Sequence, residues 1–418
     1  MHRRRFLTAA SAAGLAACAS PAPEPDAPPP FAGPTADALE QALEQPVLNL
    51  DGLDQPLIID SVRLLEKDGE QLVHVRTRDG AEGVSLTNRR DYFTGIFAER
   101  IAPFFLGKDA LELESTLLWD LYRHGSNYKL QGLAFWSCQA WVEMAILDLL
   151  GRVADKSIAD LMGGRLRDTV AFYVASGRRD STPEEEVEYL QSLIDETHAR
   201  AVKFRLGGRM SRNQDAMPGR SENLIRLARD TFGEAIDLHG DANSSYDPEY
   251  AIPIGRVLEE VNAVYFEEPC PFDHLEDTKR VTDTLTIPVS GGEQEFSERR
   301  FRWMIANHAV DIVQPDLFYY GGLIRSARVA NMADLAGMPT TVHISGGFGF
   351  VYMLHFAART KNIGRYQEYK RSIEVFGDWF DPPLSIADGR MSVPTGPGVG
   401  IKDPAALLRD ATLIAEAK

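Results

Sequence analysis

The sequence predicts an α/β fold in which a small α+β domain precedes a parallel barrel. Short apolar runs alternate with amphipathic helices from residue 170 onward, and a hairpin pattern precedes them. The chain has 418 residues, more than one hydrophobic core usually serves. Eight strand candidates spread over about 200 residues in the second part, which fits a TIM barrel.

The first folded domain is predicted between residues 45 and 165. Two alternating apolar segments between residues 58 and 84 flank Asp79-Gly80, a dipeptide typical of a tight hairpin turn. Apolar residues between 142 and 150 then recur at the spacing of one helix face. We therefore expect a small antiparallel sheet followed by helices.

The barrel is predicted from residue 166 to residue 376, and its helix starts are well marked. Thr182 is an expected N-cap, Pro183 the first helical residue and Glu185 the capping-box glutamate. Because the catalytic groups of such barrels lie at the C-terminal ends of the strands, polar residues that end apolar runs form one candidate set. From the second to the eighth strand they are Lys203, Asp241, Glu267, Glu293, Asp316, His343 and Glu368.

Three of these acids, Asp241, Glu267 and Glu293, end consecutive predicted strands. Carboxylates that converge on one side of a barrel mouth repel one another unless a cation is present. Oxygen ligands with room for water and substrate favour Mg²⁺ over zinc. Any one of these acids alone is readily explained as an ordinary surface residue. That explanation does not fit three acids at successive strand ends.

Several short motifs together resemble the mandelate racemase subgroup of the enolase superfamily. They are Lys203-Phe204-Arg205, Asp241-Ala242-Asn243, Glu267-Glu268-Pro269, Gly292-Glu293, Gly321-Gly322 after Asp316, and His343. The resemblance begins near residue 50. It implies a (β/α)7β barrel capped by the first domain, with specificity loops expected at residues 86–90 and 123–129.

The resemblance also implies abstraction of a proton next to a carboxylate. In enolase-superfamily sites a Lys or His base works while Mg²⁺ stabilises the ene-diolate. The three consecutive carboxylates are the implied Mg²⁺ ligands. By position, His343 oriented by Asp316 is the implied general acid/base, Lys203 contacts the substrate carboxylate, and Glu368 hydrogen-bonds the developing enolate.

Arg205 departs from the racemases of this subgroup, which use a lysine there as the second base. Arginine stays protonated and is a poor proton acceptor, so it is expected to be a fixed charge near the substrate. With His343 as the remaining base, dehydration of an acid sugar to a 2-keto-3-deoxy acid is favoured. Asn243, on the same side of its strand as Asp241, is predicted to contact a substrate hydroxyl.

Two other functions stay open on the sequence alone. One is a racemase or epimerase of a 2-hydroxy acid. The other is a non-catalytic periplasmic lipoprotein that binds a carboxylate. The preferred hypothesis is a hydro-lyase whose partner is a small-molecule acid sugar, and we expect a homo-oligomer.

The N-terminal residues predict export from a bacterial cytoplasm. Arg3 and Arg4 precede a short apolar run, as in a twin-arginine signal, and residues 15–18 resemble a lipobox that would lipidate Cys18. Residues 1–18 are therefore interpreted as the signal, and residues 19–44 as a Pro/Ala-rich linker. The expected location is the periplasm, free or membrane-anchored, and an ordinary cleavable signal stays an alternative.

Composition excludes other partners. A formal net charge of −17 repels phosphate backbones, so nucleic acid is not expected, and membrane contact is expected only through Cys18. Cys138 and Cys270 are too few for a disulfide framework or a zinc site. Residues 377–418 lack the barrel rhythm and are expected to return to the first domain.

Overall fold

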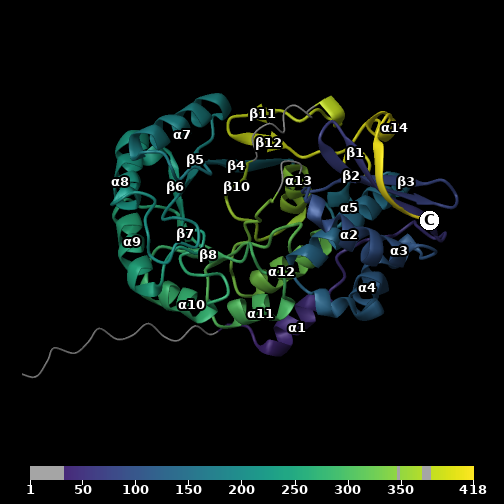
Figure 1. The fold of residues 1–418 in the computed structure, drawn as a ribbon, viewed down its shortest axis with the longest axis horizontal. Helices are drawn as coiled ribbons and strands as arrows, with labels where there is room; N and C mark the ends of the chain where they lie inside the picture. The colour runs from purple at the N-terminus through teal and green to yellow at the C-terminus, as the bar shows by residue number, and fades with distance from the viewer. Residues whose placement is uncertain (1–32, 346–348, 370–377) are drawn as a thin grey trace, which may run out of the picture. The chain divides into compact units, whose positions relative to one another are not determined.

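The computed structural model describes residues 33–345, 349–369 and 378–418 (Figure 1). The predicted signal at residues 1–18 and Cys18 lie outside the described residues. The predicted linker at residues 19–44 needs correction, because its last part, Ala36–Glu44, forms helix α1. The Thr35 side chain caps this helix, and α1 packs against α12 (Leu323–Leu335) with its apolar face buried.

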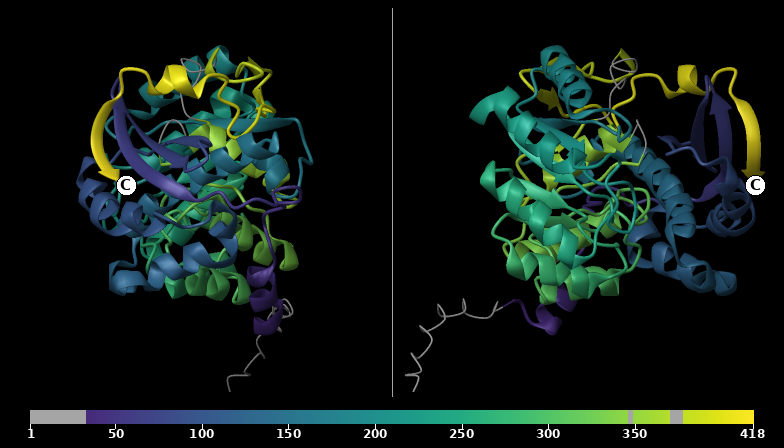
Figure 2. Two further views of the ribbon diagram at one scale, coloured as in Figure 1. Left: turned by 90° about the vertical axis from the view of Figure 1, so that its right-hand side faces the viewer. Right: turned by 60° about the vertical axis from the view of Figure 1, so that its left-hand side comes forward.

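The first sheet is antiparallel. Its strands are β1 (Ile59–Lys67), β2 (Glu70–Thr77) and β3 (Glu82–Leu86), with β13 (Thr412–Ala417) on the outer side of β1. The predicted Asp79-Gly80 turn joins β2 to β3. Figure 2 shows the C-terminal strand β13 beside the first strands of the chain.

Helix α5 (Leu133–Ala154) packs against β3 and β2. Among the described helices it is the one that is long and apolar enough to cross a membrane, yet 89% of that apolar window is buried inside the protein. A helix that is apolar all round and buried is a core helix. The remaining helical segments of this region are η1 (Asp91–Phe93), α2 (Thr94–Ile96), η2 (Phe97–Ile101), α3 (Ala102–Phe105), η3 (Ala110–Glu112), η4 (Leu113–Leu117), α4 (Leu118–Arg123), η5 (His124–Leu130) and α6 (Ile158–Leu161).

The second sheet is a closed parallel barrel. Its strands are β4 (Thr169–Ala175), β5 (Ala201–Arg205), β6 (Asp237–Asp241), β7 (Tyr265–Glu267), β8 (Val289–Gly291), β9 (Ile312–Val313) and β10 (Gln367–Glu368). The seventh strand position is filled by residues 340–343, which join β9 through isolated bridges. Parallel pairing of β10 with β4 closes the barrel.

Seven helices of the described chain follow the first seven barrel positions. They are α7 (Pro183–Thr197), α8 (Arg220–Phe232), α9 (Pro248–Glu260), α10 (Leu275–Thr284), α11 (Glu298–Ala306), α12, and α13 (Gly349–Arg359). The predicted capping box at Thr182 forms, since its side chain and that of Glu185 satisfy each other's backbone N–H groups. The predicted (β/α)7β barrel with an N-terminal cap is confirmed.

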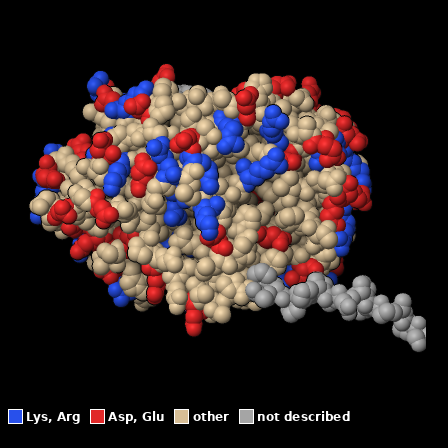
Figure 3. Space-filling view, turned by 180° about the vertical axis from the view of Figure 1, so that it is seen from behind, with Lys and Arg blue, Asp and Glu red and all other residues tan. Residues whose placement is uncertain are grey.

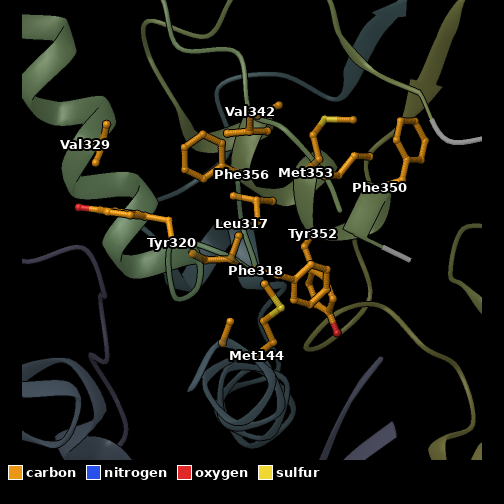
Figure 4. Close-up of a cluster of buried hydrophobic side chains, with 14 of the residues drawn as sticks. Met144, Leu317, Phe318, Tyr320, Val329, Val342, Phe350, Tyr352, Met353 and Phe356 are labelled. Atoms are coloured by element: carbon orange, nitrogen blue, oxygen red, sulfur yellow. The ribbon is translucent and has the colours of Figure 1, made fainter. Parts of the chain in front are cut away.

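Alternation along the strands separates the core from the site. On β5, Val202 and Phe204 belong to the apolar core, whereas Lys203 and Arg205 contact carboxylates of β6 and β7. Figure 4 shows the core between the first domain and the barrel, where Met144 of α5 faces side chains of the barrel.

On the face of the molecule in Figure 3, basic side chains gather near the middle and acidic side chains lie mostly toward the edges.

The described C-terminal residues 378–418 contact the barrel before they reach the first sheet. A hairpin of β11 (Ile386–Ala387) and β12 (Arg390–Ser392) pairs antiparallel with barrel strand β4. The chain then continues through α14 (Pro404–Leu408) to β13 in the first sheet. The segment therefore joins both regions.

Asp148 of α5 links the first sheet to this segment. Its buried carboxylate accepts the N–H of Val84 at 2.9 Å and that of Val399 at 2.8 Å, and it pairs with Arg152 at 2.9 Å. Gly398 lies so close that an added Cβ would stand 2.0 Å from Asp148 Oδ1.

We predict that Asp148→Asn lowers the free energy of unfolding by at least about 3 kcal/mol, because it leaves the partly buried charge of Arg152 without its partner. Asp120→Asn is the control, since Asp120 also pairs with an arginine but is exposed. It should cost less than about 1 kcal/mol. Urea unfolding measures both, and equal losses would contradict this role of Asp148.

Candidate active site

The ends of the barrel strands bring the candidate residues together. Arg205 lies beside Asp241 in the register of β5 and β6, and Asp241 lies beside Glu267 in the register of β6 and β7. Because side chains alternate across a strand, Lys203 and Arg205 point to the same side. Their charges and those of the two acids therefore meet at the mouth of the barrel.

Lys203 is fully buried and anchored to acidic partners. Its Nζ lies 2.9 and 3.0 Å from the two carboxylate oxygens of Glu267 and 3.7 Å from Asp241 Oδ2. The ring of Tyr173 lies 5.0 Å below the ammonium. Burial opposes the charge, but the carboxylates of Glu267 and Glu368 outweigh it and raise the pKa of Lys203. The surrounding carboxylates thus favour the charged form of Lys203.

Arg205 forms an ion pair with Asp241 through its Nη1. Its Nε donates to the carbonyl oxygen of Ser176 at 3.1 Å, which fixes the plane of the guanidinium. Asp241 also accepts the backbone N–H of Asn243 at 2.8 Å. The predicted fixed charge at Arg205 is therefore held against a predicted metal ligand.

His343 faces three acids. Its Nδ1 lies 2.6 Å from Asp316 Oδ2, while its Nε2 lies 3.3 Å from Glu293 Oε2 and 3.7 Å from Glu368 Oε2. Burial alone lowers the pKa of His343, but the surrounding carboxylates, first Glu293 and then Glu368, raise it above its ordinary value. The structure thus brings together the predicted base, its orienting acid and the eighth-strand acid.

Asp316 is itself held rigidly. Its Oδ1 accepts the backbone N–H groups of Phe318 and Tyr319, each at 2.7 Å, and the Ser345 hydroxyl at 3.2 Å. With Oδ1 satisfied in this way, Oδ2 is left for the imidazole. An acid fixed like this sets which ring nitrogen of His343 holds the proton.

The three predicted metal ligands each lie against a basic side chain. Asp241 pairs with Arg205, Glu267 with Lys203, and Glu293 with His343. Over the described residues, no three His, Cys, Asp or Glu side chains are gathered so that they would hold a metal ion. The predicted cluster is therefore not assembled in this arrangement.

The donor chemistry nevertheless fits a divalent cation. The three predicted ligands are buried carboxylates at or just after the ends of consecutive strands, and a fourth acid, Glu268, follows Glu267. Within the described part of the chain, the buried Oε1 of Glu268 has no hydrogen-bond partner. Burial and the charges of Glu293 and Glu267 raise the pKa of Glu268. Burial acts to raise the pKa of Glu293 as well, but the neighbouring basic side chains outweigh burial and lower it. An oxygen-rich, acidic centre of this kind suits Mg²⁺.

The first domain contributes residues that the sequence indicated only as a loop. Trp141 Nε1 donates to Asn88 Oδ1 at 2.8 Å, and Asn88 Nδ2 donates to the Ser345 hydroxyl at 2.9 Å. Because Ser345 donates to Asp316, this chain reaches from α5 to the partner of His343. The predicted loop at residues 86–90 thus contacts the site. Side chains joined across 257 residues leave no local signal in the sequence.

His239 lies beneath the site as part of an aromatic layer. It stacks on Tyr265 with ring centroids 4.1 Å apart and meets Tyr173 edge to face. Burial, followed by the charge of Lys203, lowers the pKa of His239 to about 3. It is therefore a neutral structural histidine.

Comparison with known families agrees with this geometry. Residues 185–403 match the family described as enolase C-terminal domain-like, and residues 59–163 match the N-terminal domain of mandelate racemase and muconate lactonizing enzyme. The chain belongs to the enolase superfamily. A solved protein of Roseobacter denitrificans is 34% identical, with a TM-score of 0.79 over 87% of this chain and all of that one.

Other relatives of this enolase-superfamily chain have named activities. The arabinonate dehydratase of Saccharolobus solfataricus is 28% identical over 72% of this chain and 78% of its own length. The L-talarate/galactarate dehydratase of Salmonella typhimurium is 28% identical over 79% of each chain. A mandelate racemase/muconate lactonizing protein of Paracoccus denitrificans, solved with magnesium, is 25% identical over 86% of this chain and 99% of that one, with a TM-score of 0.77. The chain is an enzyme, and the alternative of a non-catalytic binding lipoprotein is not retained.

We predict that Asp316→Asn lowers the pKa of His343, because a neutral amide replaces a carboxylate that favours the imidazolium. NMR titration of ring-labelled histidine measures the change. The control is Asp311→Asn, since Asp311 pairs with His308 at 2.9 Å far along the chain from His343. An unchanged His343 titration in Asp316→Asn would contradict the pairing.

Proposed function

We propose that this enzyme removes the proton next to a carboxylate of an acid sugar and eliminates water, in a reaction that depends on Mg²⁺. The observation on which this rests is the His343 imidazole, held by Asp316 and turned with Nε2 toward the acids of the barrel mouth. Two relatives are named as acid-sugar dehydratases, which supports this substrate class.

A single base that both accepts and returns a proton favours dehydration. With Nδ1 donating to Asp316, the neutral imidazole presents Nε2 as the acceptor of the α-proton. The same Nε2 then returns that proton to the β-hydroxyl, which leaves as water when the carbon–oxygen bond breaks. The resulting enol tautomerises to a 2-keto-3-deoxy acid.

The cations of the mouth stabilise the negative charge that develops on the substrate carboxylate. Lys203 is buried and its pKa is raised, and one preorganised hydrogen-bond donor in such a site is typically worth about 3 kcal/mol of transition-state stabilisation. Asp241, Glu267 and Glu293 would hold Mg²⁺, which when bound supplies further positive charge to the same oxygens. Glu368 is placed to hydrogen-bond the enolate.

Racemisation is the second candidate, because a mandelate racemase/muconate lactonizing protein is among the solved relatives. A racemase needs a base on each face of the substrate. Arg205 and Lys203, both on the second barrel strand, are poor proton acceptors: Arg205 is a guanidinium paired with Asp241, and the pKa of Lys203 is raised. The charges of this site therefore support dehydration over racemisation.

We also propose that the protein is exported, on the evidence of Arg3, Arg4 and the lipobox-like residues before Cys18. Fractionation of cells that make the native chain or Cys18→Ala tests this. Full-length protein with its signal attached in the host cytoplasm would contradict export.

We predict that chelation of divalent cations abolishes turnover and that Glu293→Gln weakens Mg²⁺ binding by about 10-fold to 100-fold or more, because a charged ligand is lost. Calorimetric titration of metal-free protein with Mg²⁺ measures the affinity. Glu298→Gln, the same change five residues on in helix α11, is the control and should leave the affinity unchanged. Normal turnover in excess chelator, without a bound divalent ion, would contradict the metal assignment.

We predict that His343→Asn lowers turnover by roughly a hundredfold to ten-thousandfold and stops exchange of the substrate α-proton with D₂O. Binding should persist through Lys203. Proton NMR of the substrate follows the exchange, and His308→Asn on the barrel periphery is the control. Exchange that continues in His343→Asn for either configuration of a true substrate would show that another residue is the base.

A further inference from the structure

Two arginines from neighbouring loops meet at one side of the barrel mouth. Arg179 follows β4 and Arg209 follows β5. The Nη2 of Arg179 donates to Asn243 Oδ1, and the Nη2 of Arg209 lies 3.5 Å from the same oxygen. A single neutral amide oxygen therefore receives two guanidinium groups.

Neither guanidinium of this pair has a carboxylate partner among the described residues. The adjacent Arg178 differs, because it lies 3.8 Å from Glu186 and stacks over Tyr189. The Nε of Arg179 is buried and has no hydrogen-bond partner in the described part of the chain. Burial, followed by the charges of Arg205 and Arg209, lowers the pKa of Arg179 to about 10. Guanidinium groups gathered in this way are stabilised by an anion.

Asn243 connects the arginine pair to the reaction centre. Its Oδ1 faces the two guanidinium groups, while its Nδ2 lies 3.3 Å from Asp241 Oδ2 and 3.5 Å from Glu268 Oε2. Asn243 follows the third strand of the barrel and His343 lies on the seventh. In a closed eight-stranded barrel these positions are opposite each other. A substrate whose α-carbon lies at His343 and whose other end reaches the third strand would contact the arginines.

We infer that Arg179 and Arg209 form a subsite for a second anionic group, so that the substrate is an acid sugar charged at both ends. This inference rests on the proposed function, and it narrows the substrate class. The planar fork of arginine matches the oxygens of a carboxylate or a phosphate and forms paired, charge-assisted hydrogen bonds with them. A terminal hydroxymethyl group offers none of this charge.

Calorimetric binding to the His343→Asn protein, in which turnover is expected to be strongly reduced, tests the subsite. The probes are galactarate, glucarate and mannarate, the matching monoacids galactonate, gluconate and mannonate, and 6-phosphogluconate. The best-bound dianion should bind about 10-fold or more tightly than its matching monoacid. Adding Arg179→Gln should remove this preference and leave monoacid affinity unchanged, and Arg179→Lys, which keeps the charge but not the fork, should retain part of it.

Arg178→Gln is the matched control, since it removes the same charge one residue away, and it should keep the preference. Equal affinities for dianions and monoacids, a preference that survives Arg179→Gln, or no binding of any dianion would overturn the subsite. Tighter binding of 6-phosphogluconate than of the diacids would assign the second group as a phosphate. A dianion preference without turnover of any acid sugar by the native enzyme would reject the proposed function and keep the subsite.

Discussion

Buried negative charge at the mouth of the barrel is the constraint on which the rest of the site depends. Asp241, Glu267 and Glu293 are almost completely removed from water, and isolated carboxylates cannot stay ionised there. Each lies against a basic side chain, namely Arg205, Lys203 and His343 respectively. The basic side chains that the reaction requires are thus the same groups that lie against the acidic centre.

This coupling explains why the site is built from strand ends and supported from outside the barrel. Short parallel strands fix the backbone position of each charged residue, but they do not orient the end of a long side chain. Orientation comes from hydrogen bonds: Ser176 holds Arg205, and the chain through Asn88 and Ser345 holds Asp316. The first domain therefore helps to set the geometry of the base, as well as covering the barrel.

Much of the fold can be predicted from the sequence, because short-range patterns of apolar and polar residues indicate the barrel strands and helices. The capping box at Thr182 and the polar residues that end apolar runs locate the strands and their functional ends. Helix α1 is not predicted, since it lies directly behind a Pro/Ala-rich tract and is stabilised by packing on α12. The seventh strand is reduced to bridges at residues 340–343, which no periodicity distinguishes from a full strand.

The candidate site is predicted less completely than the fold, because its remaining parts depend on tertiary contacts. A motif places Arg205 near the substrate but says nothing of its ion pair with Asp241. Arg179 and Arg209 lie in loops, where a lone arginine is usually a solvated surface residue, and only their meeting at Asn243 distinguishes them. Charge pairs of this kind cannot be predicted from local sequence, because they form only when the folded chain brings the strands side by side.

The most direct test of the dehydration mechanism is the product formed when acid sugars are incubated with the enzyme and Mg²⁺ in D₂O. Proton NMR separates the two outcomes, since one base on one face implies loss of water whereas two bases imply inversion. With His343 as the single base, a 2-keto-3-deoxy acid should form while the substrate disappears. An epimer that bears deuterium at the α-carbon, with no keto acid, would contradict it.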